Sequence, residues 1–325
     1  MTFSVVIATY TEKRWAELVD AVESALHQSP PPHEVIVVVD HNDELLARVA
    51  AELGDRVVVT PNRDRRGLSG ARNTGAAVAT GDYVAFLDDD ARARPGWLAS
   101  LQAALERPGV VGAGGLAVPE WEAGSAPSWL PDEFLWVVGC HYRGHRTTSG
   151  PVRSPIGANM AYPRDLISRV GGFSWQFATP PFDRCDETEF CLRLTSQLGG
   201  HIEFEPSAVV DHRVAAERNE WSYFIRRCLL EGRAKAALSV RTGVDTATGV
   251  ERTYVTRTLP AGFFRYIGRG LMGRPIEFLR AANLLVGLFA TAIGFIQGHL
   301  QMDPDHRRSL VTAPEWVGAG TEKAS

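Results

Sequence analysis

Three consecutive aspartates follow a short apolar run and are the residues with the clearest capacity for chemistry. The run covers 84–87, and the carboxylates belong to Asp88, Asp89 and Asp90. Mg²⁺ and Mn²⁺ prefer hard oxygen ligands, so one or two carboxylates at a strand end suit a metal that also binds phosphate. A polar turn or a helix cap is the structural alternative, because aspartate is common in both. Three adjacent negative charges also require a cation to offset their repulsion.

A second acidic group lies in the segment CDETEFCLR. Asp186 stands where a helix N-cap is expected, and Glu189 follows it at the spacing of a capping box. Glu187 has no such structural role, and a carboxylate in the first turn of a helix can act as a general base. His212 follows an apolar run, where it is a structural residue, a metal ligand or a proton carrier.

The basic segment RDRRGLSGARNTG, residues 63–75, is a further candidate. Its glycines do not match a dinucleotide fingerprint, and the chain has no P-loop motif at this point. An arginine-rich turn before a helix N-terminus can still hold an anion. A solvated basic loop is the structural alternative.

Alternating strands and helices should position these groups. Apolar runs predict buried strands at 4–9, 34–40, 56–60 and 83–87, with helices between them, and this alternation indicates a parallel sheet covered on both faces. Ligands of such sheets bind at the carboxyl ends of the strands. Thr9, Asp40 and Asp88 all fall at those ends.

The rest of the chain predicts an irregular middle and a helical end. Residues 115–180 are rich in Trp, Gly and Pro, and helices are expected over 186–198 and 219–240. We therefore expect a catalytic domain over 1–215, with a nucleotide-binding half (1–115) and an acceptor-binding half (116–215). A helical region over 216–310 and a flexible tail over 311–325 would follow.

Composition narrows the function classes. The 325-residue chain has a formal net charge of -4, so no overall basic field favours nucleic acid. Its four cysteines form no CxxC pair, so neither a disulfide framework nor a zinc site is indicated, and a cytoplasmic location is expected.

The segment 281–296 is the most apolar part of the chain. It is shorter than the roughly 20 residues that span a bilayer, so a buried helix or a membrane-embedded hairpin fits better. In the stretch just before it, Arg265, Arg269, Arg274 and Arg280 alternate with aromatic and aliphatic residues. This mixture predicts peripheral contact with the cytoplasmic face of an anionic membrane. A helical pair packed on the core is the alternative.

The ordered motifs SVVIATY, VIVVVD, GLSGARNTG, VAFLDDD, IGANMAY, DETEFCLRL and VVDH resemble those of family 2 glycosyltransferases over residues 1–240. The resemblance implies an α/β GT-A fold, with a Rossmann-like, mostly parallel sheet, flanking helices and a helical C-terminal extension. RRGLSGARNTG, EFLWVVGC, CDETEFCLR and RRCLLEGRAKA look most similar to the glucosyl-dolichyl-phosphate glucuronosyltransferase-like branch, whose enzymes extend a sugar on a polyprenyl-phosphate carrier.

The resemblance also implies roles for individual residues. Thr9, Tyr10 and Asp40 would contact the nucleobase, Arg72 would lie near the nucleotide, and Asp88 would approach the ribose. Asp90 and His212 would bind Mn²⁺ or Mg²⁺. The family's acidic pair usually reads Glu-Asp with the second residue as base; the inverted order here makes Glu187 the base by position and keeps Asp186 as a rival. The residues expected to line the sugar or acceptor pocket are Gly157, Ala158, Asn159 and Met160.

The expected activity is therefore metal-dependent, inverting transfer of a sugar from a nucleotide-diphosphate sugar. The expected donor is a UDP-sugar, and the expected acceptor is a hydroxyl of a sugar or of a lipid-linked sugar. A nucleotidyltransferase is one alternative, but TYTEKRWAEL after the first strand lacks the glycines such an enzyme needs. A non-catalytic sugar-binding protein on the same fold is the other. It need not keep Asp88, Asp90, Glu187 and His212 together.

Overall fold

The computed structural model describes residues 1–178, 185–243, 249 and 251–311. In this part of the chain the strands form one sheet in the order β3-β2-β1-β4-β8-β6-β9-β5, and β7 pairs with β9 at its side. The strands are β1 (Phe3–Thr9), β2 (Glu34–Val39), β3 (Val58–Pro61), β4 (Tyr83–Asp88), β5 (Ala91–Ala93), β6 (Val110–Trp121), β7 (Gly150–Val152), β8 (Asn159–Pro163) and β9 (His201–Val214).

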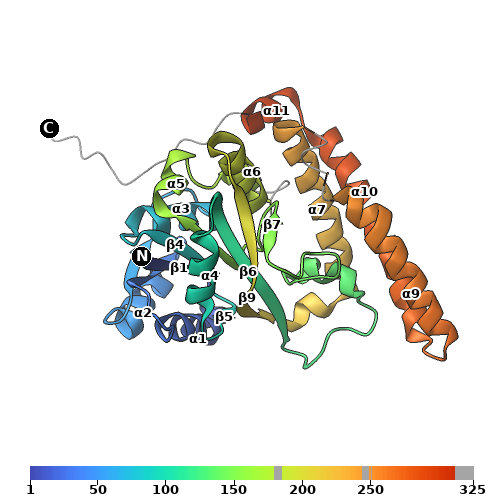
Figure 1. The fold of residues 1–325 in the computed structure, drawn as a ribbon, viewed down its shortest axis with the longest axis horizontal. Coiled ribbons are helices and arrows are strands. Elements are labelled where there is room, and N and C mark those ends of the chain that lie inside the picture. Colours follow the sequence, from blue (N-terminus) through green and yellow to red (C-terminus); the bar gives the residue numbers. More distant parts are fainter. Residues whose placement is uncertain (179–184, 244–248, 250, 312–325) are drawn as a thin grey trace.

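Helices cover both faces of this sheet, and a group of C-terminal helices lies along one side of the molecule (Figure 1). The α-helices are α1 (Trp15–Leu26), α2 (Asp43–Leu53), α3 (Leu68–Val78), α4 (Trp97–Leu105), α5 (Arg164–Arg169), α6 (Asp186–Leu198), α7 (Trp221–Thr242), α9 (Leu259–Leu271), α10 (Ile276–Gln301) and α11 (Pro304–Val311). The short helices are η1 (Glu12–Arg14), η2 (Asp132–Val138), η3 (Trp175–Phe177), η4 (Ala216–Asn219) and η5 (Tyr254–Thr258).

The first four strands run parallel, and β1, β2 and β4 are buried on both faces, as their apolar sequences predict, whereas the edge strand β3 is partly exposed. Successive side chains point to opposite faces, so Val5 and Ile7 pack with α1, α2 and α4 while Val6 packs with α3, α5 and α6. The helices α6 and α7 begin and end close to the predicted positions, and α1, α2 and α3 lie between the predicted strands as expected. The carboxyl ends of β1, β2 and β4 thus lie at one edge.

The second half of the sheet is mixed, which corrects the expectation of a mostly parallel sheet. β8 runs antiparallel to β4 and β6, whereas β6 and β9 are parallel. Residues 115–180 also hold more regular structure than predicted. The strand β6 was not predicted because it is rich in glycine. A side chain at Gly115 would collide with the carbonyl oxygen of Ala208, so close packing excludes the β-branched residues that are typical of strands.

The apolar segment 281–296 lies inside the single helix α10, so the prediction of a membrane-embedded hairpin is wrong. α10 packs closely on α7, where a Cβ at Gly294 would lie 2.1 Å from the carbonyl oxygen of Leu229. By length and composition α10 is the one helix among the described residues that could cross a membrane, and a third of its most apolar window is buried. Most of the predicted tail, residues 312–325, lies outside the described residues.

Candidate active site

A cavity of about 1130 Å³ opens at the carboxyl ends of β1 and β4 and extends to α6 and α7. Its wall includes nine of the residues that the sequence nominates, listed here in chain order: Thr9, Tyr10, Asp40, Arg72, Asp88, Asp90, Asp186, Glu187 and His212. Gly157 and Ala158 also line it. The sheet edge thus brings together groups that are far apart in the chain, as expected for an open α/β sheet.

Asp88, Asp90 and His212 form one group of potential metal ligands. One ligand atom from each residue lies within 4.8 Å of the others. The register of β5 on β9 explains this convergence, because His212 lies directly opposite Ala91, the residue after Asp90. Two carboxylates and an imidazole are a donor set that suits Mn²⁺, and the carboxylates also suit Mg²⁺. The residues present therefore fit a divalent cation.

Two arginines that sequence reasoning missed offset the charge of the aspartates. Arg14 Nη1 lies 2.9 Å from Asp89 Oδ1 and 3.0 Å from Asp90 Oδ2. Arg218 Nη2 lies 3.2 Å from Asp90 Oδ2. The first lies in η1 and the second in η4, on segments without any recognisable anion-binding motif. The repulsion that the sequence predicts is thus already offset by the protein.

His212 is the third cation at this cluster. Its Nε2 lies 3.3 Å from Asp90 Oδ1. Burial alone would lower the pKa of His212, but its hydrogen bond to Asp90 and that residue's charge raise the pKa to about 10. The same contacts hold the pKa of Asp90 below its usual range although burial opposes the shift. A metal that binds the imidazole must therefore displace a proton.

Asp89 has a positioning role that the sequence did not reveal. It accepts a hydrogen bond of 2.8 Å from the hydroxyl of Thr9 and another of 2.9 Å from Arg14. Burial raises the pKa of Asp89 to about 6, and the charge of Arg14 opposes this shift. Thr9 is therefore fixed by Asp89 in the cavity wall, and the neighbouring Tyr10 is 58% exposed beside it.

Asp40 directly follows β2 and lies at the same edge of the sheet. Its Oδ1 accepts a hydrogen bond of 2.6 Å from Asn62, and its Oδ2 accepts one of 2.9 Å from the backbone N–H of Gly67. Gly67 has a φ of 118°, which favours glycine, and it directly precedes α3. The basic segment 63–75 is thereby folded against the strand ends.

Arg72 links the metal-ligand group to the second acidic group. Its Nη1 lies 3.1 Å from Asp186 Oδ2, and its Nη2 lies 3.4 Å from Asp88 Oδ1. The same Nη2 donates to the carbonyl oxygen of Gly157 at 3.2 Å. A buried guanidinium needs such partners, because an unpaired buried charge is strongly destabilising.

Asp186 and Glu187 have different surroundings. Asp186 is the first residue of α6 rather than its N-cap, which is Cys185, and it accepts a hydrogen bond of 3.0 Å from Ser69. Glu187 is half-buried in the cavity wall. Burial and the charge of Asp186 raise the pKa of Glu187 to about 8, although Arg72 opposes the shift. A carboxylate with a pKa near neutrality is suited to accept a proton in catalysis.

Two of the residues expected in the pocket lie in the core instead. Asn159 and Met160 belong to β8 and are fully buried. Asn159 accepts a hydrogen bond of 2.8 Å from Trp97 Nε1 and donates one of 2.8 Å to the carbonyl oxygen of Ala208. The expectation that these two line the cavity is therefore corrected: they anchor the strand that follows Gly157 and Ala158.

Sequence comparison identifies clear relatives. A family model described as Glycosyl transferase family 2 matches residues 4–171. A glucosyl-dolichyl phosphate glucuronosyltransferase from Haloferax volcanii is 35% identical over 245 residues, which cover 74% of this chain and 78% of the relative.

Two solved structures share the fold. A mannosyltransferase from Pyrobaculum calidifontis, in complex with GDP-Man and Mn²⁺, matches with a TM-score of 0.53 and 20% identity over 89% of this chain and 86% of that chain. GalNAc-T7 with UDP, GalNAc and Mn²⁺ matches with a TM-score of 0.51 and 18% identity, over 74% of this chain and 51% of that chain.

Proposed function

Because the chain belongs to glycosyl transferase family 2 and has the GT-A fold, we propose that it is a metal-dependent, inverting enzyme that uses a UDP-sugar. That it is a glycosyltransferase follows from the family. The observation that carries the finer proposal is the presence of a metal-ligand group and a carboxylate of raised pKa in one cavity. Family membership favours sugar transfer over both alternatives, nucleotidyl transfer and non-catalytic sugar binding.

Asp88, Asp90 and His212 would hold Mn²⁺ or Mg²⁺ in this proposal. The bound cation supplies charge neutralisation for the departing diphosphate. Arg14 and Arg218 lie beside the same carboxylates and would add positive charge next to the phosphates. Thr9, Tyr10 and Asp40 lie along the strand ends, where the nucleobase and ribose would bind.

Glu187 would take the proton of the acceptor hydroxyl as that oxygen attacks the anomeric carbon. A single displacement with one base inverts the configuration, whereas a retaining glycosidase uses two flanking carboxylates and a covalent intermediate. Asp186 is held by Ser69 and Arg72, so its role in this proposal is to orient Arg72 and to raise the pKa of Glu187.

Donor screening tests the proposal. The full-length protein is incubated with Mn²⁺ and a panel of nucleotide sugars, together with a short polyprenyl-phosphate-linked sugar as acceptor. Transfer from a UDP-sugar that stops when EDTA removes the metal is the expected result. The absence of both transfer and UDP binding would refute the proposed activity.

The pH dependence of transfer should follow the ionisation of Glu187. Only the deprotonated carboxylate accepts a proton, and its pKa is raised to about 8. The value of kcat/KM is therefore expected to rise about tenfold per pH unit and to level off near pH 8. Asp186→Asn removes the negative charge that raises the pKa of Glu187, so the rise in kcat/KM should occur at lower pH in this variant. A profile that is flat from pH 6 to pH 9 would contradict this assignment.

Peripheral membrane contact at the cytoplasmic face is a second part of the proposal, because a lipid-linked acceptor would reside there. The support is an exposed apolar face of α10, made of Leu285, Phe289, Ile293, Ile296 and Leu300. Of the predicted headgroup arginines, Arg265 instead pairs with buried Glu133 at 2.6 Å. Arg280 donates to the carbonyl oxygen of Ser128, and Arg274 is exposed.

Co-sedimentation with vesicles tests this contact. The protein should sediment with vesicles of phosphatidylglycerol and phosphatidylcholine. Phe289→Asp should weaken this binding by about tenfold or more, because Phe289 is 63% exposed and would lose its burial in lipid. Ala51→Asp on the exposed face of α2 adds the same charge elsewhere and is the control. Equal sedimentation of the wild type and Phe289→Asp would refute the contact.

A further inference from the structure

A second charged cluster lines the same cavity and takes no part in the proposed chemistry. It consists of Arg153, Arg227, Glu231, Lys235 and Glu251. Arg153 Nη1 and Nη2 each donate to a different oxygen of Glu251 at 2.7 Å, and Lys235 Nζ lies 2.7 Å from Glu251 Oε1. Within this group of five described residues, three cations face two carboxylates.

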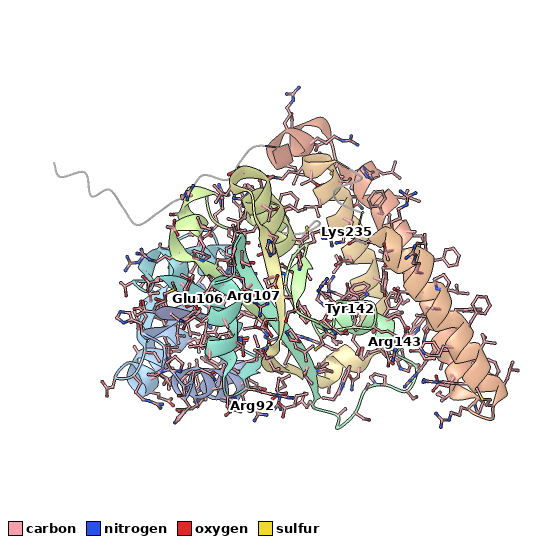
Figure 2. All side chains as sticks on the ribbon, viewed as in Figure 1. Arg92, Glu106, Arg107, Tyr142, Arg143 and Lys235 are labelled. Carbon is pink, nitrogen blue, oxygen red and sulfur yellow. The ribbon has the colours of Figure 1, made fainter. Side chains whose placement is uncertain are left out.

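This cluster borders the segments that position the proposed base. Ser154, next to Arg153, hydrogen-bonds at 3.1 Å to Thr188, the residue after Glu187. On the other side, Cys185 Sγ lies 3.6 Å from the carbonyl oxygen of Ala234, which precedes Lys235. Figure 2 shows Lys235 on α7, on the side of the sheet that faces the C-terminal helices. Arg153 and Lys235 therefore line the same cavity as Glu187, on segments that contact the start of α6.

Glu251 contacts the two cations in the manner of a bound ligand. Two parallel hydrogen bonds between a guanidinium and a carboxylate are the arrangement by which arginine recognises carboxylates and phosphates. Glu231, by comparison, makes the longer contacts, at 3.3 Å to Arg227 and 3.4 Å to Lys235. Burial would raise the pKa of Glu251, but Lys235 and Arg153 lower it to about 2, so its carboxylate is ionised.

We propose that Arg153 and Lys235 form a subsite for an oxyanion of the substrate, and that Glu251 of the chain itself occupies this subsite until the substrate displaces it. The inference rests on the proposed function and defines the substrate class of the same cavity. The oxyanion is either the carboxylate of an acidic donor sugar or a phosphate of the acceptor. Both offer the oxygen pair that Arg153 already binds in Glu251.

Arg164 differs from Arg153 in its position relative to the cavity. Arg153 lines the cavity, whereas Arg164 is exposed on α5 and donates to the carbonyl oxygen of Gly81 at 2.9 Å. Arg164 therefore provides a matched control, because its substitution removes the same charge from a surface outside the cavity.

Calorimetry on the Mn²⁺-loaded full-length protein tests the subsite with two ligand pairs that differ in one anionic group. UDP-glucuronate is compared with UDP-glucose, and, with UDP present, glucose 1-phosphate is compared with methyl glucoside. In the pair that contains the oxyanion bound by the subsite, the charged member should bind more tightly than its neutral partner. Arg153→Gln should weaken that member by about tenfold or more and leave its neutral partner unchanged. Glu251→Gln should tighten it, and Arg164→Gln should change neither.

Other outcomes overturn the inference or the function separately. Suppose that UDP binds the wild type, but that Arg153→Gln and Lys235→Gln change the affinity for the charged ligand and for its neutral partner by the same factor. The subsite is then refuted and the proposed function stands. If UDP itself does not bind, the proposed function fails. Should Arg153→Gln not fold, as judged by its Tm, Lys235→Gln and Glu251→Gln decide the question, because their expected effects have opposite signs.

Discussion

Glu187→Gln is expected to lower the transfer rate by about 100- to 10,000-fold, the range that a general base contributes. The amide keeps the size and the place of the side chain in the cavity wall but cannot accept a proton at neutral pH. Binding of the UDP-sugar should change little, because the diphosphate is assigned to the metal-ligand group. Steady-state transfer with saturating donor, together with a separate measurement of donor affinity, checks both statements.

Asp186→Asn is the matched comparison. Asp186 accepts hydrogen bonds from Ser69 and Arg72, so an asparagine there should lower Tm and move the pH profile while leaving measurable transfer. The assignment of the two carboxylates would be reversed if Asp186→Asn abolished transfer and Glu187→Gln retained it.

Asp90→Asn is expected to reduce metal-dependent activity by about 100-fold or more, because the cation's charge stabilisation is worth several kcal/mol. Asp90 is the aspartate that contacts His212, Arg14 and Arg218 together. The amide would weaken a ligand and leave Arg14 and Arg218 beside a neutral side chain. Titration of Mn²⁺ in the presence of UDP should show a correspondingly weaker affinity.

Asp89→Asn separates a ligand effect from a change in overall charge. It removes the same negative charge, but its carboxylate faces Thr9 and Arg14 and lies outside the metal-ligand group. Affinity for Mn²⁺ should therefore fall less in Asp89→Asn than in Asp90→Asn. Equal losses in the two variants would mean that the aspartates act as a diffuse negative field rather than as distinct ligands.

The sequence predicted the parts of the fold that depend on local pattern. The apolar runs of β1, β2 and β4 and their polar ends at Thr9, Asp40 and Asp88 follow from residue order alone. The strand β8 was missed because it lies in the segment 115–180, which was expected to be irregular, and its antiparallel direction depends on pairing with β4 that residue order does not show. The hairpin alternative failed for a different reason: it rested on the length of the apolar segment 281–296, whereas the helix α10 continues through the less apolar residues on either side of that segment.

Site residues that belong to a sequence motif could be predicted. Contacts that depend on strand pairing or on ion pairs between distant segments could not. Asp90 and His212 could be nominated from their motifs, but their approach depends on the register of β5 on β9. Arg14 and Arg218 had no such marker, because an isolated arginine has the same appearance in a solvated loop. Asn159 shares its motif with Gly157, but it begins the buried strand β8, so its amide is used inside the protein.

The anomeric configuration of the transfer product tests the central proposal most directly. That proposal is a single displacement, in which Glu187 accepts the proton of the acceptor hydroxyl and the diphosphate leaves from the metal-ligand group. Proton NMR of the product, recorded for whichever UDP-sugar supports turnover, reports the configuration of the new bond. We predict that an α-linked donor gives a β-linked product. A product that retains the α configuration would contradict the mechanism.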